Sequence, residues 1–469
     1  MWMGAHMDKH HTARDRHQAY IWFRTAAEQG NAYAQFNLGL MYKKGEGVVQ
    51  DDARAFVWLR LAALQGLAFA QNHLGAMYYH GRGVAQSDEE AVQWFRCAAA
   101  QGDASAQQNL GQMYRKGRGV LQNDELALAW FYRASEQGVA SAQSLLGEAY
   151  ARGLGAKRND ALALAWFRKA ALQGDAQAQL NLGLVYKRGQ GVMQSDTQAV
   201  AWFRQAAAQG LAVAQRQLGV AYAEGVGVAL DQLRAYAWLL RAAEQDDADA
   251  QFNLGLMLAR GQGVEQDEAR AVVWYRRAAR QGHCSAQYNL GGMLAGGRGV
   301  ARNVREAVEW YGKAAEQGAA NAQFNLGVLY ANGEGVPHDP ARAVRWYRKA
   351  ADQGDASAQN NLGVMYANGH GVPQDDDMAV HWYARAAEQG HALAQYNLGG
   401  MYNSGRGVPK DPVRSYMWVA LAAESGDATA GGAVAGYARK LSTDDLGRAR
   451  ALTRQWKRTR APAPTPAPD

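Results

Sequence analysis

Asparagine recurs in this 469-residue chain at steps of 36 residues or multiples of 36. An amide side chain offers both a hydrogen-bond donor and an acceptor, so a ladder of amides can bind the backbone of an extended peptide whatever its sequence. The same periodicity would arise if each amide bonded only to the backbone of a neighbouring repeat. Peptide binding is the interpretation we favour, with packing as the alternative. The eight positions are Asn37, Asn109, Asn181, Asn253, Asn289, Asn325, Asn361 and Asn397.

A second set of candidate binding residues lies six and seven residues after the asparagine positions and is basic in the N-terminal half: Lys43, Lys44, Arg115, Lys116, Arg152, Lys187 and Arg188. The last four repeats have no basic residue there, and three of them carry an aromatic residue just before the asparagine: Tyr288, Phe324 and Tyr396. A basic half favours acidic side chains or a C-terminal carboxylate, and an aromatic half favours apolar anchors. The alternative is a solvated basic face without a ligand. Phe36 and Phe252, which lie outside the last four repeats, blur the aromatic contrast.

Other chemistry has less support, and we expect no cofactor and no metal. Four histidines near the start, His6, His10, His11 and His17, could form a metal site only if that segment were ordered, and histidines near a chain end are usually just exposed. The only two cysteines, Cys97 and Cys284, are too far apart in sequence to suggest a disulfide framework or a Cys-rich zinc site.

The elements that must position these residues follow from a repeat of 36 residues. Twelve of the 14 tryptophans and a helix glycine keep this step without an insertion, which defines eleven complete repeats over residues 31–426. Such a period is typical of solenoids, in which each repeat buries its apolar face against its neighbours. We number the repeats from residue 31, so that repeat 1 is 31–66 and repeat 11 is 391–426.

Each repeat predicts two helices joined by a loop. In repeat 1, Ala34, Leu38, Met41 and Tyr42 have helical spacing, and a glycine two residues after the asparagine suggests close approach of a partner helix. A Gly-x-Gly turn follows, and the second helix contains the tryptophan, which we expect in the core with the Leu, Tyr and Ala series. Residues that cap helix N-termini stand twelve positions after the helix glycine in all eleven repeats: Asp51, Ser87, Asn123, Asn159, Ser195, Asp231, Asp267, Asn303, Asp339, Asp375 and Asp411.

These motifs resemble the Sel1-like repeat, a relative of the tetratricopeptide repeat with a longer loop between its helices. The pattern Ala-Gln-x-Asn-Leu-Gly-x-Met-Tyr, Gly-x-Gly-Val-x-x-Asp and Ala-x-x-Trp-[Phe/Tyr]-x-x-Ala-Ala-x-Gln-Gly carries the resemblance over more than four fifths of the chain. Ala156, Asp246 and Ser415 depart from it, and we expect none of them to break the array. The resemblance implies an all-α solenoid that acts as an adaptor in protein complexes, often in bacteria, with first helices lining a concave groove.

An enzyme is the alternative function, because some disulfide-bonded relatives in this family have been described as penicillin-binding or β-lactamase proteins. The chain has no Ser-x-x-Lys, Ser-Asp-Asn or Lys-Thr-Gly motif, and the disulfides of those relatives are absent. Helix capping explains the pairs Ser87-Asp88 and Ser195-Asp196. We therefore expect a scaffold that binds a protein or peptide in its groove and is not an enzyme.

The two ends of the chain differ from the array. We expect a degenerate N-terminal half-unit at residues 1–30, C-terminal capping helices at 427–456 with the last one ending at Trp456, and a disordered proline-rich tail at 457–469. Hydrophobic residues make up 48%, which is typical of a chain that folds, and the formal charge of only +7 argues against nucleic-acid binding. We also expect a monomer. Without a long apolar run we expect no membrane insertion and a cytoplasmic location, or a periplasmic or exported one if the N-terminus is incomplete.

Overall fold

The computed structural model describes residues 4–459, with side chains from residue 15 onward, and every regular element in this range is an α-helix. The chain divides into two compact bodies, Met1–Trp238 and Leu239–Asp469, which we describe separately as the N-terminal and the C-terminal body. The division falls within α13 (Gln232–Glu244). The predicted all-α solenoid of 36-residue hairpins is confirmed.

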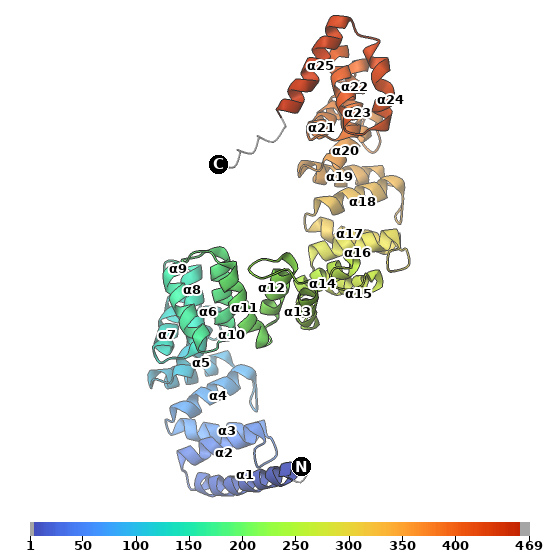
Figure 1. The fold of residues 1–469 in the computed structure, drawn as a ribbon. Helices are drawn as coiled ribbons and strands as arrows, with labels where there is room; N and C mark the ends of the chain where they lie inside the picture. The colour runs from blue at the N-terminus through green and yellow to red at the C-terminus, as the bar shows by residue number, and fades with distance from the viewer. Residues whose placement is uncertain (1–3, 460–469) are drawn as a thin grey trace. The chain divides into compact units, whose positions relative to one another are not determined.

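The N-terminal body starts with the long helix α1 (Gly4–Glu28) and continues as stacked hairpins (Figure 1). Its first helices are α2 (Ala32–Lys44), α4 (Ala68–His80), α6 (Ala104–Lys116), α8 (Ala140–Arg152), α10 (Ala176–Arg188) and α12 (Ala212–Glu224). Its second helices are α3 (Asp52–Leu64), α5 (Asp88–Ala100), α7 (Asp124–Glu136), α9 (Asp160–Leu172) and α11 (Asp196–Ala208). From α2 to α10, each first helix packs on the second helix of its own repeat and on the helix that precedes it in the chain, so these repeats share their cores with their neighbours.

The C-terminal body repeats this arrangement. Its first helices are α14 (Ala248–Arg260), α16 (Cys284–Gly296), α18 (Ala320–Asn332), α20 (Ala356–Asn368), α22 (Ala392–Ser404) and α24 (Ala428–Ala438). Its second helices are α15 (Glu268–Arg280), α17 (Val304–Glu316), α19 (Pro340–Asp352), α21 (Asp376–Glu388) and α23 (Pro412–Glu424), and the last helix is α25 (Thr443–Arg458). Unlike the regular second helices, α25 packs mainly on α23, the second helix of the preceding repeat.

All eleven predicted caps of the second helices are present. Each capping side chain accepts a hydrogen bond from the backbone N–H three residues later, as Asp51 does from Arg54 at 2.9 Å. Such a bond satisfies one of the N–H groups that a helix start leaves without an intrahelical partner. The caps therefore set where each second helix begins.

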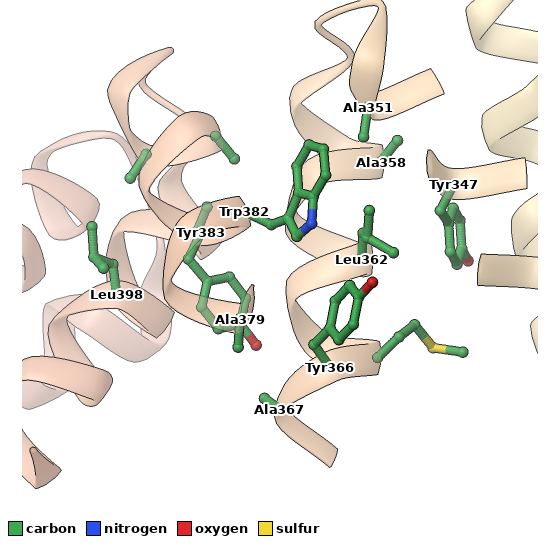
Figure 2. Close-up of a cluster of buried hydrophobic side chains, with 14 of the residues drawn as sticks. Tyr347, Ala351, Ala358, Leu362, Tyr366, Ala367, Ala379, Trp382, Tyr383 and Leu398 are labelled. Atoms are coloured by element: carbon green, nitrogen blue, oxygen red, sulfur yellow. The ribbon is translucent and has the colours of Figure 1, made fainter. Parts of the chain in front are cut away.

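The helix glycine of each first helix leaves room for the residue that follows the tryptophan in the second helix. A Cβ on Gly111 would lie 2.6 Å from Cε1 of the Phe131 ring, and equivalent close contacts recur from Gly39 against Leu59 to Gly399 against Val419. Figure 2 shows the resulting packing in one repeat, where Leu362 and Tyr366 of α20 lie beside Tyr383 of α21. These glycines are therefore packing glycines, as predicted.

The tryptophans are less buried than we expected. Trp166, Trp310, Trp382 and Trp418 are buried, but the tryptophans of the other repeats are only partly buried, and Trp22 is exposed. The fully enclosed residue is the next one, such as Phe131 or Phe203. One face of several indoles carries a cation three residues later, as Trp166 does with Lys169 Nζ 4.2 Å from the ring centroid. The indoles thus cover the core from outside, with a cation above them.

A buried glutamine ladder joins each repeat to the one before it. Gln287, which is 3% exposed, donates its amide to the carbonyl of Ala279 at 3.1 Å and accepts from the amide of Gln317 at 2.7 Å. The same pair of bonds recurs at Gln35, Gln71, Gln107, Gln143, Gln179, Gln251, Gln323 and Gln359. Each glutamine bridges the second helix of the preceding repeat and the end of the second helix in its own repeat.

The series of helices continues through the three departures Ala156, Asp246 and Ser415. Ser415, fully buried where other repeats have alanine, donates its hydroxyl to the carbonyl of Gly399 at 2.8 Å. Asp246 replaces a glycine and keeps that glycine's left-handed backbone, with φ at 63°. Its carboxylate accepts from Gln251 at 3.2 Å.

We expect Asp246→Gly to raise the free energy of unfolding by about 0.5–1 kcal/mol, because an L-residue is strained at positive φ. The reverse substitution at the equivalent site, Gly282→Asp, should lower it, since Gly282 has φ at 91° and a Cβ added there would meet nothing within 4 Å, so only the backbone strain changes. Urea denaturation followed by circular dichroism measures both. Destabilisation by Asp246→Gly would show that the carboxylate bond outweighs the backbone strain.

The ends differ in detail from the prediction. α1 is one continuous helix where we expected a second helix preceded by a reduced first helix. α25 ends at Arg458, two residues beyond the expected end at Trp456, so the tail expected from 457 does not begin before 459. Lys457 pairs with Glu424 and Arg458 still belongs to the last turn, which explains the extension. Residues 460–469 and the side chains of His6, His10 and His11 lie outside the described residues.

Candidate functional site

The first helices carry the predicted binding residues on one face. All eight asparagines are partly buried, and each stands two residues before the packing glycine that contacts the second helix. The basic positions follow in the last turn of the same helices, as at Lys43 and Lys44 of α2. Each first helix therefore presents an amide near its middle and, in much of the N-terminal body, cations at its end.

Hollows between consecutive first helices bring these two sets of residues together. In one of them, about 610 Å³, Glu148 and Arg152 of α8 face Asn181 and Arg188 of α10, and Arg158 of the loop after α8 also lines the hollow. The asparagine of one repeat thus lies beside the basic position of the repeat before it. Sequence spacing alone did not indicate this pairing, because the residues are about one repeat apart in the chain.

Two smaller hollows have the same construction. One of 230 Å³ lies between α4 and α6, where Tyr79 and His80 meet Asn109 and Lys116. Another of 270 Å³ lies between α14 and α16 of the C-terminal body, where Arg260 meets Asn289. The recurrence shows that the hollow is a product of the repeat geometry, and its charge depends on which side chains each repeat supplies.

Several asparagines already bond within the chain. Asn37 donates to the carbonyl of Tyr33 at 2.9 Å, Asn109 to Asn72 Oδ1 at 3.0 Å, and Asn397 to Asn360 Oδ1 at 3.0 Å. These bonds use one amide hydrogen each and leave further donor and acceptor capacity. Packing within the chain therefore explains some of the asparagine hydrogen bonds, but it does not use all the donors and acceptors of these amides.

In the C-terminal body, asparagines face tyrosines of the preceding repeat. Burial raises the pKa of Tyr275 and Tyr347, and raises that of Tyr311 to about 12, while hydrogen bonds from the amides facing them oppose the rise. The partners of Tyr275, Tyr311 and Tyr347 are Asn289, Asn325 and Asn361, in that order. The equivalent residues of repeats 2–5 are phenylalanines, which offer no hydroxyl. The asparagines of repeats 3 and 5 therefore have no tyrosine partner of this kind, although Asn109 donates to Asn72 and Asn181 accepts from Gln177 at 3.1 Å.

The basic residues differ in how far they are neutralised. Glu148, which the sequence interpretation missed, lies 3.1 Å from Arg115 and 3.4 Å from Arg152, and so binds both. Lys187 donates to Gln217 at 3.2 Å. Lys116 and Arg188 are exposed on the same face. Their charges are accessible to a ligand.

Lys43 lies beside His73, which occupies the asparagine position of repeat 2. Its Nζ is 3.5 Å from His73 Nδ1. Burial and the nearby Lys43 lower the pKa of His73 to about 4, so this imidazole is neutral at neutral pH. Burial, followed by the nearby Arg82, lowers the pKa of Lys43. Lys43 is therefore a poorer ligand position than the exposed Lys44.

The aromatic residues of the last four repeats pack inside their own hairpins. The ring of Tyr288 is 5.7 Å from that of Tyr311, and Phe324 is 6.0 Å from Tyr347. Tyr396 packs beside the buried cluster that contains Val419. All three remain partly exposed, so their predicted role as partner anchors stays a prediction.

Aromatic residues also gather on the first-helix face of repeats 1 and 2. Phe36 lies 6.5 Å from Phe69 and 5.5 Å from His73, measured between ring centroids. The aromatic character that we assigned to the C-terminal half is therefore present at the N-terminal end as well. A simple division into a basic and an aromatic half does not describe the chain.

Among the described residues, no three side chains of the metal-binding types come together, and no helix is both long and apolar enough to cross a membrane. What defines the site is the repeated hollow between first helices. The fold places the chain in the class of helical-repeat solenoids, which typically use such a face for binding.

The family model of the Sel1 repeat matches this chain twelve times, at residues 9–31, 32–67, 68–103, 104–139, 140–175, 176–211, 212–247, 248–283, 284–318, 320–355, 356–391 and 392–427. The chain belongs to the Sel1 repeat family. Proteins of this family are typically protein-interaction scaffolds and are generally non-catalytic. The first match, at 9–31, covers the part of α1 that continues the second-helix pattern.

Two crystal structures of similar proteins cover much of the chain. A protective antigen present in uropathogenic Escherichia coli strains, which displays an SLR fold, is 36% identical, with a TM-score of 0.80 over 96% of this chain and 99% of that one. A Sel1 repeat protein from Oxalobacter formigenes is 34% identical, with a TM-score of 0.51 over 67% of this chain and 93% of that one. None of the curated proteins compared with the chain matches it.

Proposed function

We propose that the first-helix face of the N-terminal body binds an extended acidic segment of a partner protein. The observation that carries the proposal is the 610 Å³ hollow in which Arg152, Arg158 and Arg188 surround the amide of Asn181. Cations at the rim attract carboxylates, and an amide can bond the peptide backbone between them. The role of a scaffold, typical of the family, fits this chemistry.

The charges in the hollow favour an acidic ligand even after internal pairing. Arg158 is paired with Asp160 at 2.9 Å, and Arg152 shares Glu148 with Arg115. Arg188 is exposed at the end of α10, and Lys116 occupies the same position of α6. Two cations at equivalent positions of repeats 3 and 5 can engage carboxylates spaced along one segment.

Charge reversal tests the proposal. We expect a fluorescein-labelled oligoglutamate peptide to bind the protein, and the triple variant Lys116→Glu, Arg152→Glu, Arg188→Glu to weaken binding about tenfold or more, since each lost rim contact is worth roughly 0.5–1 kcal/mol. Fluorescence anisotropy at low salt measures the affinity, and added salt should weaken it.

The matched control places the same charge change on second helices, as Arg60→Glu, Arg133→Glu and Lys169→Glu. These residues are exposed on α3, α7 and α9. An equal loss of affinity in this control would mean that net charge alone attracts the peptide. Oligoglutamine serves as the uncharged probe, and unchanged oligoglutamate binding by the first-helix variant would reject the site.

A further inference from the structure

The first helix of the chain exposes a face that every regular second helix buries. In α3, Ala55 and Leu59 are 0% exposed because α2 of the same hairpin covers them. The equivalent residues of α1 are Ala19 and Phe23, and both are partly exposed. Within the described residues, no first helix packs on that side of α1.

The tryptophan of α1 shows the same difference. Trp22 is 69% exposed, whereas the equivalent tryptophans are partly buried, as Trp58 of α3 is, or buried, as Trp382 of α21 is at 5%. Ala26 is likewise partly exposed where Ala62 of α3 is fully buried. α1 therefore presents a partly exposed apolar face, made of Ala19, Trp22, Phe23 and Ala26, which we call the α1 face. Phe23 and Ala26 also pack on the buried cluster that contains Ala27 and Leu38, and both stay partly exposed.

α24, the last of the first helices, lacks the second helix that packs on every regular first helix. α24 continues the 36-residue step of the first helices, and Ala435 stands where Gly399 packs against Val419 in α22. Ala430 is buried against the preceding repeat, but Ala435 is exposed. α25 does not cover this side, because it packs mainly on α23, where Trp456 lies 6.0 Å from Trp418.

The open side of α24 consists of small residues and so leaves room for a large one. A Cβ placed on Gly431, Gly432 or Gly436 would meet no atom within 4 Å, so no described side chain fills the space beside them. α24 has no charged side chain between Ala428 and Ala438, so a contact here would bury no charge from it. We call this surface, made of Gly431, Gly432, Ala435 and Gly436, the α24 face.

The two faces are complementary halves of the hairpin that the chain forms elsewhere. In that hairpin a small residue of the first helix receives a large residue of the second, as Gly111 receives Phe131 and Gly147 receives Phe167. The α24 face supplies the small residue, Ala435, and the α1 face supplies the large one, Phe23. The same packing therefore already occurs many times within the chain.

We propose that the α24 face of one molecule packs on the α1 face of a second molecule of this chain, with Ala435 against Phe23. The contact completes a Sel1 hairpin between two copies and is heterologous, because each copy contributes a different end. Head-to-tail association then replaces the monomer expected from the sequence. It does not depend on the acidic-segment site, which lies on other residues.

Two single variants and their mixture test the proposal. We expect the wild-type chain to form a concentration-dependent series of species in sedimentation velocity, starting at twice the 50.9 kDa of one chain. Phe23→Arg and Ala435→Arg should each stay monomeric, because each blocks one half of the contact. Their equimolar mixture should form a 1:1 pair and nothing larger, since one intact α1 face meets one intact α24 face.

The controls carry arginine on exposed positions of the same ends, at Gln18 of α1 and Gly447 of α25, and should associate like the wild type. Ala435 is exposed, so Ala435→Arg should leave the fold intact even if Phe23→Arg destabilises it. Circular dichroism checks the helix content of both variants. A wild-type chain that is monomeric up to its highest soluble concentration overturns the proposal. So does association that survives Ala435→Arg, which would place two α1 faces together.

Discussion

Replacement of Gly111 by leucine is expected to destabilise the N-terminal body by about 3 kcal/mol or more, because the added side chain has no room against Phe131. Even a single Cβ at Gly111 would lie 2.6 Å from Cε1 and 2.8 Å from Cδ1 of that ring, and 3.2 Å from the carbonyl oxygen of Ala127. The ring is 1% exposed, so it is enclosed by the core. α6 and α7 must therefore separate.

Gly312, which lies within the second helix α17 and is not one of the packing glycines, provides the matched control. A Cβ there would meet nothing within 4 Å, so Gly312→Leu gains helix propensity of up to about 1 kcal/mol without a clash. The two identical substitutions should thus shift the chemical denaturation midpoint in opposite directions. Phe131→Ala in the Gly111→Leu background should recover part of the loss, since it removes the obstructing ring. Equal losses at both glycines would mean that backbone flexibility, and not packing, selects glycine at position 111.

The array could be predicted from the sequence because its causes are local and repeated. A capping residue such as Asp51 or Asn303 acts on a backbone group three residues away, and the 36-residue step exposes every such position eleven times. The packing glycine was recognisable because glycine in the middle of a helix is unfavourable without a compensating contact. Which residue it contacts was less clear: the tryptophan is more conspicuous, but the next residue fills the space.

The candidate site was harder to predict because it depends on contacts between repeats. Glu148 neutralises Arg115 from the following repeat, and nothing in the spacing of basic residues indicates this. The hydroxyl groups of Tyr275 and Tyr311, which engage asparagines, occur where other repeats have phenylalanine, so a comparison of repeats could have found them. The division of the chain within α13 has no counterpart in the regular 36-residue step.

The buried glutamine ladder shows a signal that the sequence contained but the interpretation did not use. Glutamine stands four residues before the helix glycine in all eleven repeats, whereas asparagine occupies its own position in only eight. A residue required for folding is expected in every repeat, and one that binds a ligand need not be. The structure agrees for glutamine, because Gln251 and Gln395 are 0% exposed and the other members are nearly as buried.

Replacement of Gln287 by leucine is therefore expected to lower the stability of the C-terminal body by about 1–3 kcal/mol. Leucine fills a similar volume but removes two hydrogen bonds, one to the buried carbonyl of Ala279 and one from the amide of Gln317. Each such bond contributes about 0.5–1.5 kcal/mol. Urea denaturation followed by tryptophan fluorescence measures the loss, and Gln122→Leu at an exposed loop position should change stability little.

A double-mutant cycle separates hydrogen bonding from packing at this site. Gln317 also donates to the carbonyl of Gly282 at 3.0 Å, so Gln317→Leu alone leaves that carbonyl and the Gln287 oxygen unpaired. In the double variant neither amide remains to lack its partner. The loss in the free energy of unfolding should therefore be smaller than the sum of the two single losses by about 1 kcal/mol or more. Strictly additive losses would show that shape, and not the amide bond, makes glutamine necessary here. A non-additive result would show that a hydrogen bond between two amides, within an otherwise apolar core, stabilises the packing of successive repeats.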